Sequence, residues 1–294
     1  MRAGIVDVGS NTMRLLVARA RKGGVDGVHV ERVPLGLGED VEQFGRISLE
    51  KLEAAEAAAR SLVERARAQG AGRLEILVTS PGRQADNGEE LRTALEIGSG
   101  LPVRILSADD EARLAYAGAL AAWRRDAASV AVVDVGGGSA QLVVGTAAAG
   151  PVWARSVDIG SLRLTKRSLR SDPPDASELE AARIEVEAAF AAITPPLPLA
   201  ALATGGTARA LRKVVGRRRL DAGELKSAVR TLSPLTTDEL VGEFGLAPGR
   251  ARTVLAGALI LVEAQRRLGL PLEVARGGIR EGAALALLSE RAAA

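Results

Sequence analysis

Two short stretches of similar sequence, DVGSNT (residues 7–12) and DVGGGS (residues 134–139), decide the fold of this chain. Each lies between two apolar runs, so each is expected to be a turn that joins two strands. The aspartate at the strand end suits a hydrated Mg²⁺ that bridges phosphate oxygens. Glycine lets the backbone approach a ligand, and the N–H groups of the turn suit phosphate oxygens. Because the pattern occurs twice, the sequence predicts two halves that together hold a phosphate group.

The composition limits the class of protein. At 294 residues the chain is long enough for two lobes that each have a core. Aromatic residues are only 2%, so the core has to consist of Ala, Val, Leu and Ile. The lack of cysteine excludes disulfides, thiolate zinc sites and a cysteine nucleophile. No apolar run approaches the ~18 residues of a membrane span, and no signal peptide precedes the first strand. We therefore expect a cytoplasmic protein without membrane contact.

The chain is basic, with a sequence pI of about 9.6, although its formal net charge is only +3. A basic surface attracts polyanions such as nucleotides or polyphosphate. A composition that is simply rich in Ala and Arg explains the same pI without any functional meaning. No aromatic platform accompanies the basic residues, so nucleic-acid binding is not expected.

The order of expected elements repeats along the chain. The first half has strands at 4–8, 13–20 and 28–34, a helix at 48–70, a strand at 74–79, a turn at 80–82, a helix at 89–96, a strand at 103–106 and a helix at 107–123. The second half has strands at 130–133, 141–145 and 152–157, a helix at 178–193, a strand at 199–203, helices from 204, at 222–232, 237–244 and 250–268, a strand at 272–275 and a helix at 280–288. This order predicts two mixed α/β lobes.

Several residues in this pattern are candidates for chemistry. A single Asp before Gly is most often a turn residue, but Asp7 and Asp134 occupy matching places in a duplicated unit. Neither turn is a P-loop or a dinucleotide-binding fingerprint. A third glycine turn, at 205–207, opens a helix and suits an anion, although a plain turn explains it equally well. Glu111 is the catalytic candidate, but a carboxylate in the first turn of a helix is also expected from the helix dipole.

Segments along the whole chain resemble the exopolyphosphatase / guanosine pentaphosphate phosphohydrolase family. They are GIVDVGSNTMRLLVA, VTSPGRQADN, ILSADDEARLAYAG, VVDVGGGSAQLVVG, GSLRLT, SDPPDASELEAAR, ALATGGTARAL and VARGGIREG. The resemblance implies an α/β protein of the actin-like ATPase superfamily, with two ribonuclease-H-like lobes around a central cleft. The lobes would be residues 1–124 and 125–294, in the short form of the family, and the last helix, about 281–294, would be able to pack on the first lobe.

The resemblance also assigns roles, residue by residue. Glu111 would orient and deprotonate the attacking water, and Arg83 would face the cleft and neutralise phosphoryl charge. Asp7 and Asp134 would hold Mg²⁺ or another divalent cation. The three turns together supply the expected phosphate-binding residues, which are Ser10, Asn11, Thr12, Gly137, Gly138, Ser139, Gly205, Gly206 and Thr207.

The chain departs from the family pattern at three positions. Gln141 replaces the usual glutamate after the GGGS turn, and Gly36 replaces an arginine. Both would lie near the cleft, so each removes a charge that helps to bind metal or phosphate. Arg252 replaces an aspartate and would change surface packing.

The leading interpretation is a Mg²⁺-dependent exopolyphosphatase that removes the terminal phosphate of inorganic polyphosphate. Guanosine pentaphosphate is the alternative substrate. A small-molecule kinase on the same scaffold is disfavoured, because Glu111 resembles a water-activating residue and no sugar-binding insert is evident. A sensor that binds polyphosphate or a nucleotide without turnover remains a rival, because Gly36 and Gln141 each remove a charge. A homodimer is left open.

Overall fold

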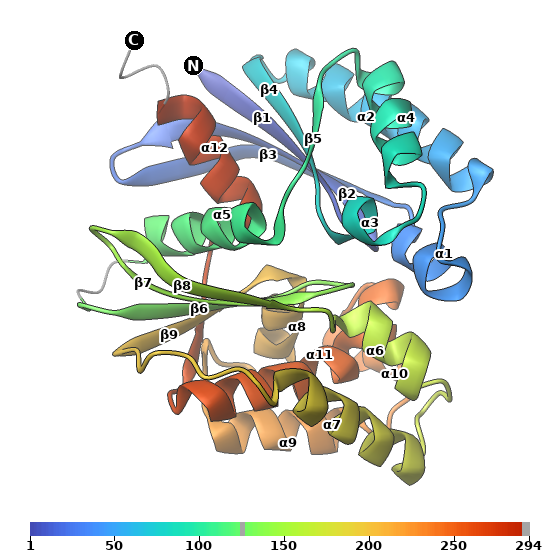
Figure 1. Cartoon of the computed structure of the whole chain (residues 1–294), viewed down its shortest axis with the longest axis vertical. Coiled ribbons are helices and arrows are strands. Elements are labelled where there is room, and N and C mark those ends of the chain that lie inside the picture. The colour runs from blue at the N-terminus through green and yellow to red at the C-terminus, as the bar shows by residue number, and fades with distance from the viewer. Residues whose placement is uncertain (124–126, 290–294) are drawn as a thin grey trace. The chain divides into compact units, whose positions relative to one another are not determined.

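The computed structural model describes residues 1–123 and 127–289, which form two compact units (Figure 1). Unit 1 consists of residues 1–123 and 277–289, and unit 2 consists of residues 127–276. The expected second lobe continued to residue 294, with a last helix able to pack on the first lobe. In the structure, the described residues from 277 onward group with unit 1, because α12 (Ile279–Ser289) packs on α5 (Ala108–Ala121) and β1 (Arg2–Val8).

Unit 1 is built on a mixed five-stranded sheet with the order β3-β2-β1-β4-β5. Its strands are β1, β2 (Thr12–Arg21), β3 (Gly24–Pro34), β4 (Ala71–Val78) and β5 (Val103–Ile105). The first three pair antiparallel, and β1, β4 and β5 pair parallel. Because parallel pairing places the ends of β1 and β4 side by side, the turn after Asp7 lies next to the residues that follow β4.

Helices cover both faces of this sheet. They are α1 (Leu37–Phe44), α2 (Leu49–Ala68), α3 (Ser80–Gln84), α4 (Gly88–Ser99), α5 and α12. Val6 and Val8 belong to the core shared with α2 and α4, whereas Ile5 belongs to the core shared with α12. Successive strand residues point to opposite faces, so a strand covered on both faces is apolar throughout. This explains the apolar run that precedes Asp7.

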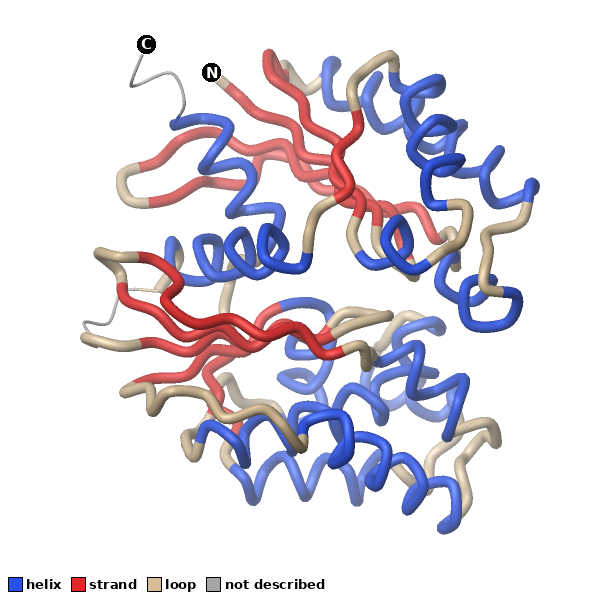
Figure 2. The backbone as a smooth tube through the Cα atoms, viewed as in Figure 1, coloured by secondary structure: helices blue, strands red, loops and turns tan. Residues whose placement is uncertain are grey.

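Unit 2 repeats the arrangement in a six-stranded sheet with the order β10-β11-β9-β6-β7-β8 (Figure 2). Its strands are β6 (Val130–Val135), β7 (Ala140–Thr146), β8 (Gly150–Val157), β9 (Ala200–Thr204), β10 (Arg219–Leu220) and β11 (Leu272–Val274). Strands β6, β7 and β8 pair antiparallel, and β6, β9 and β11 pair parallel. In their order across the sheet, β8, β7, β6, β9 and β11 therefore correspond to β3, β2, β1, β4 and β5 of unit 1.

The helices of unit 2 are α6 (Ser161–Ser168), α7 (Ala176–Phe190), α8 (Gly205–Val215), α9 (Ala222–Leu232), α10 (Thr237–Phe244) and α11 (Pro248–Leu268). Helix α11 contacts each of the other five, and most of its residues are buried. Leu, Val and Ala side chains dominate its core, as the composition requires. Among the described helices, no single one has the length and apolarity to cross a membrane, although α10 and α11 meet that criterion together across a 98° bend.

The two sheets confirm the predicted fold class of two ribonuclease-H-like lobes, but four local elements differ from the expectation. Helices α1 and α6 and the short strand β10 were not predicted, and the turn at 80–82 is the first turn of α3. Both α1 and α6 have only eight residues, and glycines without a capping side chain, Gly36 and Gly160, precede them. A Ser, Thr, Asp or Asn cap is the usual sequence signal for a helix start, so these two helices gave none.

Candidate functional site

The two DVG turns fold in the same way. In unit 1 the amide of Gly9 donates to the carbonyl of Thr12 at 3.1 Å, and in unit 2 the amide of Gly136 donates to the carbonyl of Ser139 at 3.0 Å. Asp7 and Asp134 stand at the same place before each turn. The repeated sequence therefore encodes one strand–turn–strand unit twice.

The residue opposite each aspartate differs between the units. Asp7 pairs with Arg14 in the antiparallel ladder of unit 1, and Asp134 pairs with Gln141 in that of unit 2. Residues directly opposite in a ladder project from the same face of the sheet. The equivalent position thus carries a cation in unit 1 and an amide in unit 2.

In unit 1, the segment that starts α1 holds the carbonyl groups of the turn. The amides of Leu35 and Gly36 both donate to the Asn11 carbonyl at 3.1 Å, and the Gly38 amide donates to the Ser10 carbonyl at 2.8 Å. A trans peptide points its N–H opposite to its carbonyl. The N–H groups of Asn11 and Thr12 are therefore turned away from α1, as a phosphate-binding turn requires.

Gly36, where an arginine was expected from the family pattern, has a φ of +62° and caps the start of α1. This left-handed conformation costs an ordinary L-residue roughly 1–2 kcal/mol. The Lys51 ammonium donates to the Gly36 carbonyl and to Asp40, at 2.6 Å each. Burial acts to raise the pKa of Asp40, but hydrogen bonds from Lys51 and Ser48 hold it below its ordinary value. The backbone conformation at position 36 therefore favours glycine. The ionised carboxylate of Asp40 holds Lys51 next to it.

In unit 2, the start of α6 has the equivalent role. The Ser161 amide donates to the Gly136 carbonyl, and the Leu162 and Arg163 amides donate to the Gly137 carbonyl, at distances of 2.9 to 3.1 Å. By the same geometry, the N–H groups of Gly137 and Gly138 point away from α6. The unpredicted helices α1 and α6 thus orient the two turns.

The third glycine turn lies against Asp134. Gly205, with a φ of +85°, starts α8, and a Cβ atom at this position would collide with Oδ1 of Asp134. The Thr207 hydroxyl donates to the Val135 carbonyl at 3.2 Å. Unit 2 therefore brings together the carboxylate of Asp134, which is only 6% exposed, and the second and third turns.

Gln141 lies opposite Asp134 on the neighbouring strand and is 1% exposed. Its Nε2 donates to the Ser139 hydroxyl at 2.9 Å. Its Oε1 is buried and makes no hydrogen bond within the described residues. A buried carbonyl oxygen without a donor is costly, which makes this atom a candidate to meet a ligand.

Sequence reasoning missed Arg250, whose Nη1 donates to the Thr207 hydroxyl at 3.2 Å and contacts the Ser161 hydroxyl at 3.5 Å. It links the starts of α6 and α8 beside the Asp134 turn. A basic residue near a helix start carries no signal for this role, because the contact depends on how α11 packs. Arg252, the departure expected to affect surface packing, donates to the carbonyls of Leu169 and Arg170 at the end of α6, at 2.6 and 2.8 Å.

In unit 1, Glu111 lies in the first turn of α5 and is 5% exposed. Nη2 of Arg83 lies 2.8 Å from its Oε2, and Nη1 of Arg83 donates to the Leu106 carbonyl at 2.7 Å. The Ser10 hydroxyl of the first turn hydrogen-bonds the Ser80 hydroxyl at 2.8 Å, at the start of the helix that carries Arg83. The predicted catalytic pair and the predicted phosphate turn are thus connected within unit 1.

Comparisons with known proteins identify a family that matches most of the chain. Residues 16–291 match the model of the Ppx/GppA phosphatase family. Exopolyphosphatase 2 of Mycobacterium tuberculosis is 30% identical, with 97% of this chain and 98% of that protein covered, and Exopolyphosphatase 1 of Mycobacterium bovis is 28% identical, with 99% and 90% covered.

Solved structures show the same relationship. An exopolyphosphatase-like protein matches with a TM-score of 0.90 at 26% identity, over 100% of this chain and 99% of that chain. The Ppx/GppA family member of Aquifex aeolicus matches with a TM-score of 0.82 at 25% identity, over 100% and 98%. Since the family model spans nearly the whole chain, this chain belongs to the Ppx/GppA phosphatase family.

Proposed function

We propose that the protein is an exopolyphosphatase, which transfers the terminal phosphoryl group of inorganic polyphosphate to water with the help of a divalent cation. The observation that carries this proposal is the buried Glu111 carboxylate, held by Arg83 in the same unit as the first phosphate turn. The relatives named exopolyphosphatase support polyphosphate as the substrate.

The reaction requires little covalent chemistry from the protein. A water oxygen attacks the terminal phosphorus, the bridging P–O bond breaks, and the shortened chain and orthophosphate leave. Glu111 orients the water and accepts its proton as general base. In unit 1 the N–H groups of the first turn are available to phosphate oxygens, and in unit 2 the guanidinium of Arg250 adds positive charge beside the Asp134 turn.

The residues of unit 2 fit a divalent cation. The buried Oε1 of Gln141 lacks a hydrogen-bond donor among the described residues, and Gln141 faces Asp134 across the ladder. Mg²⁺ prefers oxygen ligands, and in phosphate sites it uses one or two carboxylates together with substrate phosphates. Among the described residues, no group of three or more His, Cys, Asp or Glu side chains is placed to hold a metal ion. Within unit 2, Asp134 would hold the cation, which when bound would neutralise charge on the phosphate oxygens.

The departure at position 141 leads to a prediction about metal affinity. Gln141→Glu is expected to lower the Mg²⁺ concentration for half-maximal turnover, because it adds a charge–charge attraction. Gln141→Ala should raise that concentration only mildly, since it removes a neutral interaction of about 0.5–1.5 kcal/mol. A Mg²⁺ titration of the three proteins at fixed ionic strength measures this, and Mg²⁺-dependent shifts in melting temperature give a readout independent of turnover. An unchanged or higher midpoint for Gln141→Glu would show that position 141 does not face the metal.

An orthophosphate-release assay with long polyphosphate, short polyphosphate and guanosine pentaphosphate, each with and without Mg²⁺, tests the proposed function. We expect Mg²⁺-dependent release from polyphosphate. Release from guanosine pentaphosphate alone would replace the substrate. Binding without release would support a sensor, and phosphate transfer to an acceptor would support a kinase.

A further inference from the structure

The contacts of Arg83 suggest a role different from direct phosphate binding. Its Nη1 donates to the Leu106 carbonyl at 2.7 Å, and its Nη2 lies 2.8 Å from Oε2 of Glu111, an ion pair that lacks hydrogen-bond geometry. Leu106 directly precedes Ser107, the N-cap of the helix that carries Glu111. Arg83 therefore holds both the carboxylate and the backbone that leads into its helix.

The helix that carries Arg83, α3, is held in place by contacts with the sheet of unit 1. The Thr79 amide before α3 donates to the Val8 carbonyl at 3.0 Å, which ties α3 to the end of β1. A Cβ atom at Gly82 would lie 2.8 Å from Val78 and 3.2 Å from Ile105, so α3 packs directly on β4 and β5. This packing restricts the position of the Arg83 backbone. The guanidinium group is planar and rigid, so the directions of its N–H groups are restricted as well.

The contact with Arg83 matters most for the carboxylate of Glu111, because this carboxylate is buried. The side chain of Glu111 is 6% exposed and that of Arg83 is 22% exposed. A carboxylate with so little access to water is costly unless it is paired and hydrogen-bonded. A general base also has to be held close to its productive position, because a shift of about 1 Å can cost 10²-fold in rate.

We propose that Arg83 is a positioning residue that acts through Glu111, by fixing the carboxylate in the direction of the attacking water. The proposal rests on the proposed function, in which Glu111 is the general base. Ser10 and Ser80 extend the same connection to the first phosphate turn, so α3 places the base relative to the bound phosphate within unit 1. The rival role is direct neutralisation of phosphoryl charge by the guanidinium.

The two roles predict different kinetics for Arg83→Gln. A positioning role lowers kcat by about 10- to 100-fold and leaves KM for polyphosphate within about threefold of the wild-type value. Direct phosphate binding raises KM by about tenfold or more, because a charge-assisted contact contributes about 1.5–3 kcal/mol to binding. Steady-state orthophosphate release over a range of polyphosphate concentrations separates kcat from KM.

A double-mutant cycle with Glu111→Gln gives the decisive measurement. If Arg83 acts through the carboxylate, Arg83→Gln should cost less than about threefold in kcat once Glu111 is already glutamine. Equal losses in both backgrounds, or a dominant rise in KM, would overturn the proposal and leave the proposed function intact. A wild-type rate for Glu111→Gln alone would instead overturn the general-base assignment, and the positioning role with it.

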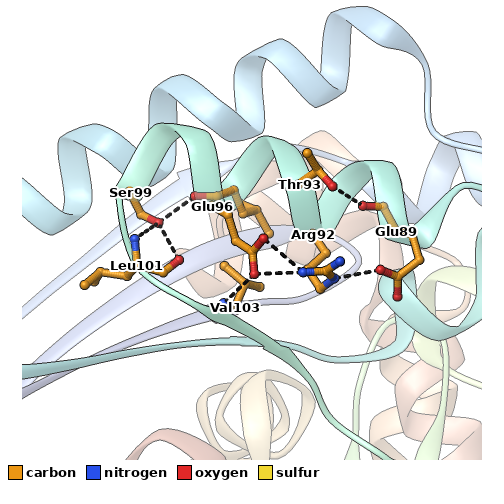
Figure 3. Close-up of polar contacts among 8 residues, drawn as sticks. Glu89, Arg92, Thr93, Glu96, Ser99, Leu101 and Val103 are labelled. Carbon is orange, nitrogen blue, oxygen red and sulfur yellow. Dashed lines mark hydrogen bonds and ion pairs between the residues drawn. The ribbon is translucent and has the colours of Figure 1, made fainter.

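Arg92→Gln is the matched control (Figure 3). Arg92 lies on α4 of the same unit and forms hydrogen-bonded ion pairs with Glu89 and Glu96, at 2.6 and 2.9 Å. The substitution thus removes hydrogen-bonded Arg–Glu pairs at a partly exposed position of the same unit, and it should leave both kcat and KM unchanged. A loss as large as that of Arg83→Gln would mean that any broken ion pair in unit 1 lowers the rate.

Arg83→Lys is a second variant that tests the proposal in case Arg83→Gln does not fold. A lysine keeps the charge but lacks the planar fork that joins Leu106 and Glu111, so we expect an unchanged KM with a kcat between those of the wild type and Arg83→Gln. Melting temperatures of both variants are compared with that of Arg92→Gln. Full kcat in well-folded Arg83→Lys, together with a raised KM in Arg83→Gln, would assign the residue to charge alone.

Discussion

Replacement of Glu111 by glutamine is expected to lower the rate of polyphosphate hydrolysis by about 10²–10⁴-fold, the usual contribution of a general base. Glutamine has nearly the same size as glutamate but does not accept the proton of the attacking water. Its amide oxygen keeps a polar atom beside Arg83, whose Nη2 lies 2.8 Å from Oε2 of the carboxylate. The fold and the KM for polyphosphate should therefore change little, and kcat should carry the loss.

Glu96→Gln is the control for this variant. Glu96 is also paired with an arginine in unit 1, Arg92, and its carboxylate also accepts from the Val103 amide at 3.1 Å. Its substitution should leave kcat unchanged. Initial rates of orthophosphate release with equal melting temperatures for the variants provide the measurement. If Glu111→Gln keeps more than about a third of the wild-type rate, Glu111 is only an acidic residue of a helix start.

The elements that the sequence predicted are those with local signals. Apolar runs that end in DVG define β1 and β6, and the expected helix at 237–244 coincides with α10, whose N-cap Thr236 forms a capping box with Glu239. The duplicated order of elements was enough to predict two mixed α/β lobes, and the family resemblance added that they are ribonuclease-H-like. These features depend on residues a few positions apart, so the sequence carries them directly.

Helices α1 and α6 could not be predicted in this way, because their starts are stabilised by partners distant in sequence. The Gly38 amide finds its acceptor at Ser10, and the Ser161 amide finds its acceptor at Gly136. No side chain caps either helix. The same carbonyl contacts orient the phosphate turns. The two helices that the sequence did not predict are therefore also the helices that shape the candidate site.

The contacts of the site arginines were hidden for the same reason. The resemblance named Arg83 but not its contact with Glu111, which depends on the pairing of β5 with β4. Arg250 had no signal at all, since only the packing of α11 brings it to Thr207. Positions of candidate residues were therefore accessible from the sequence, whereas the pairing of charges required the structure.

Removal of the Asp134 carboxylate by Asp134→Ala is expected to abolish most of the Mg²⁺-dependent turnover, with a loss of at least about 10²-fold. A bound metal contributes several kcal/mol of charge stabilisation in such reactions, and each 1.36 kcal/mol corresponds to a factor of ten. The backbone of Asp134 pairs with Gln141 and Thr204 in the centre of the sheet, and alanine preserves these pairings.

The experiment combines turnover with a direct readout of metal binding. Mg²⁺ should raise the melting temperature of the wild type and have a smaller effect on Asp134→Ala, and excess chelator should reduce the wild-type rate to the level of the variant. Asp26→Asn is the control, because it alters a partly exposed strand aspartate that pairs with Arg21 at 3.1 Å. Full wild-type activity in excess chelator would remove the metal from the mechanism. Loss of turnover in Asp134→Ala with an unchanged response to Mg²⁺ would place the cation elsewhere and leave Asp134 a role in orienting the turn against which Gly205 packs.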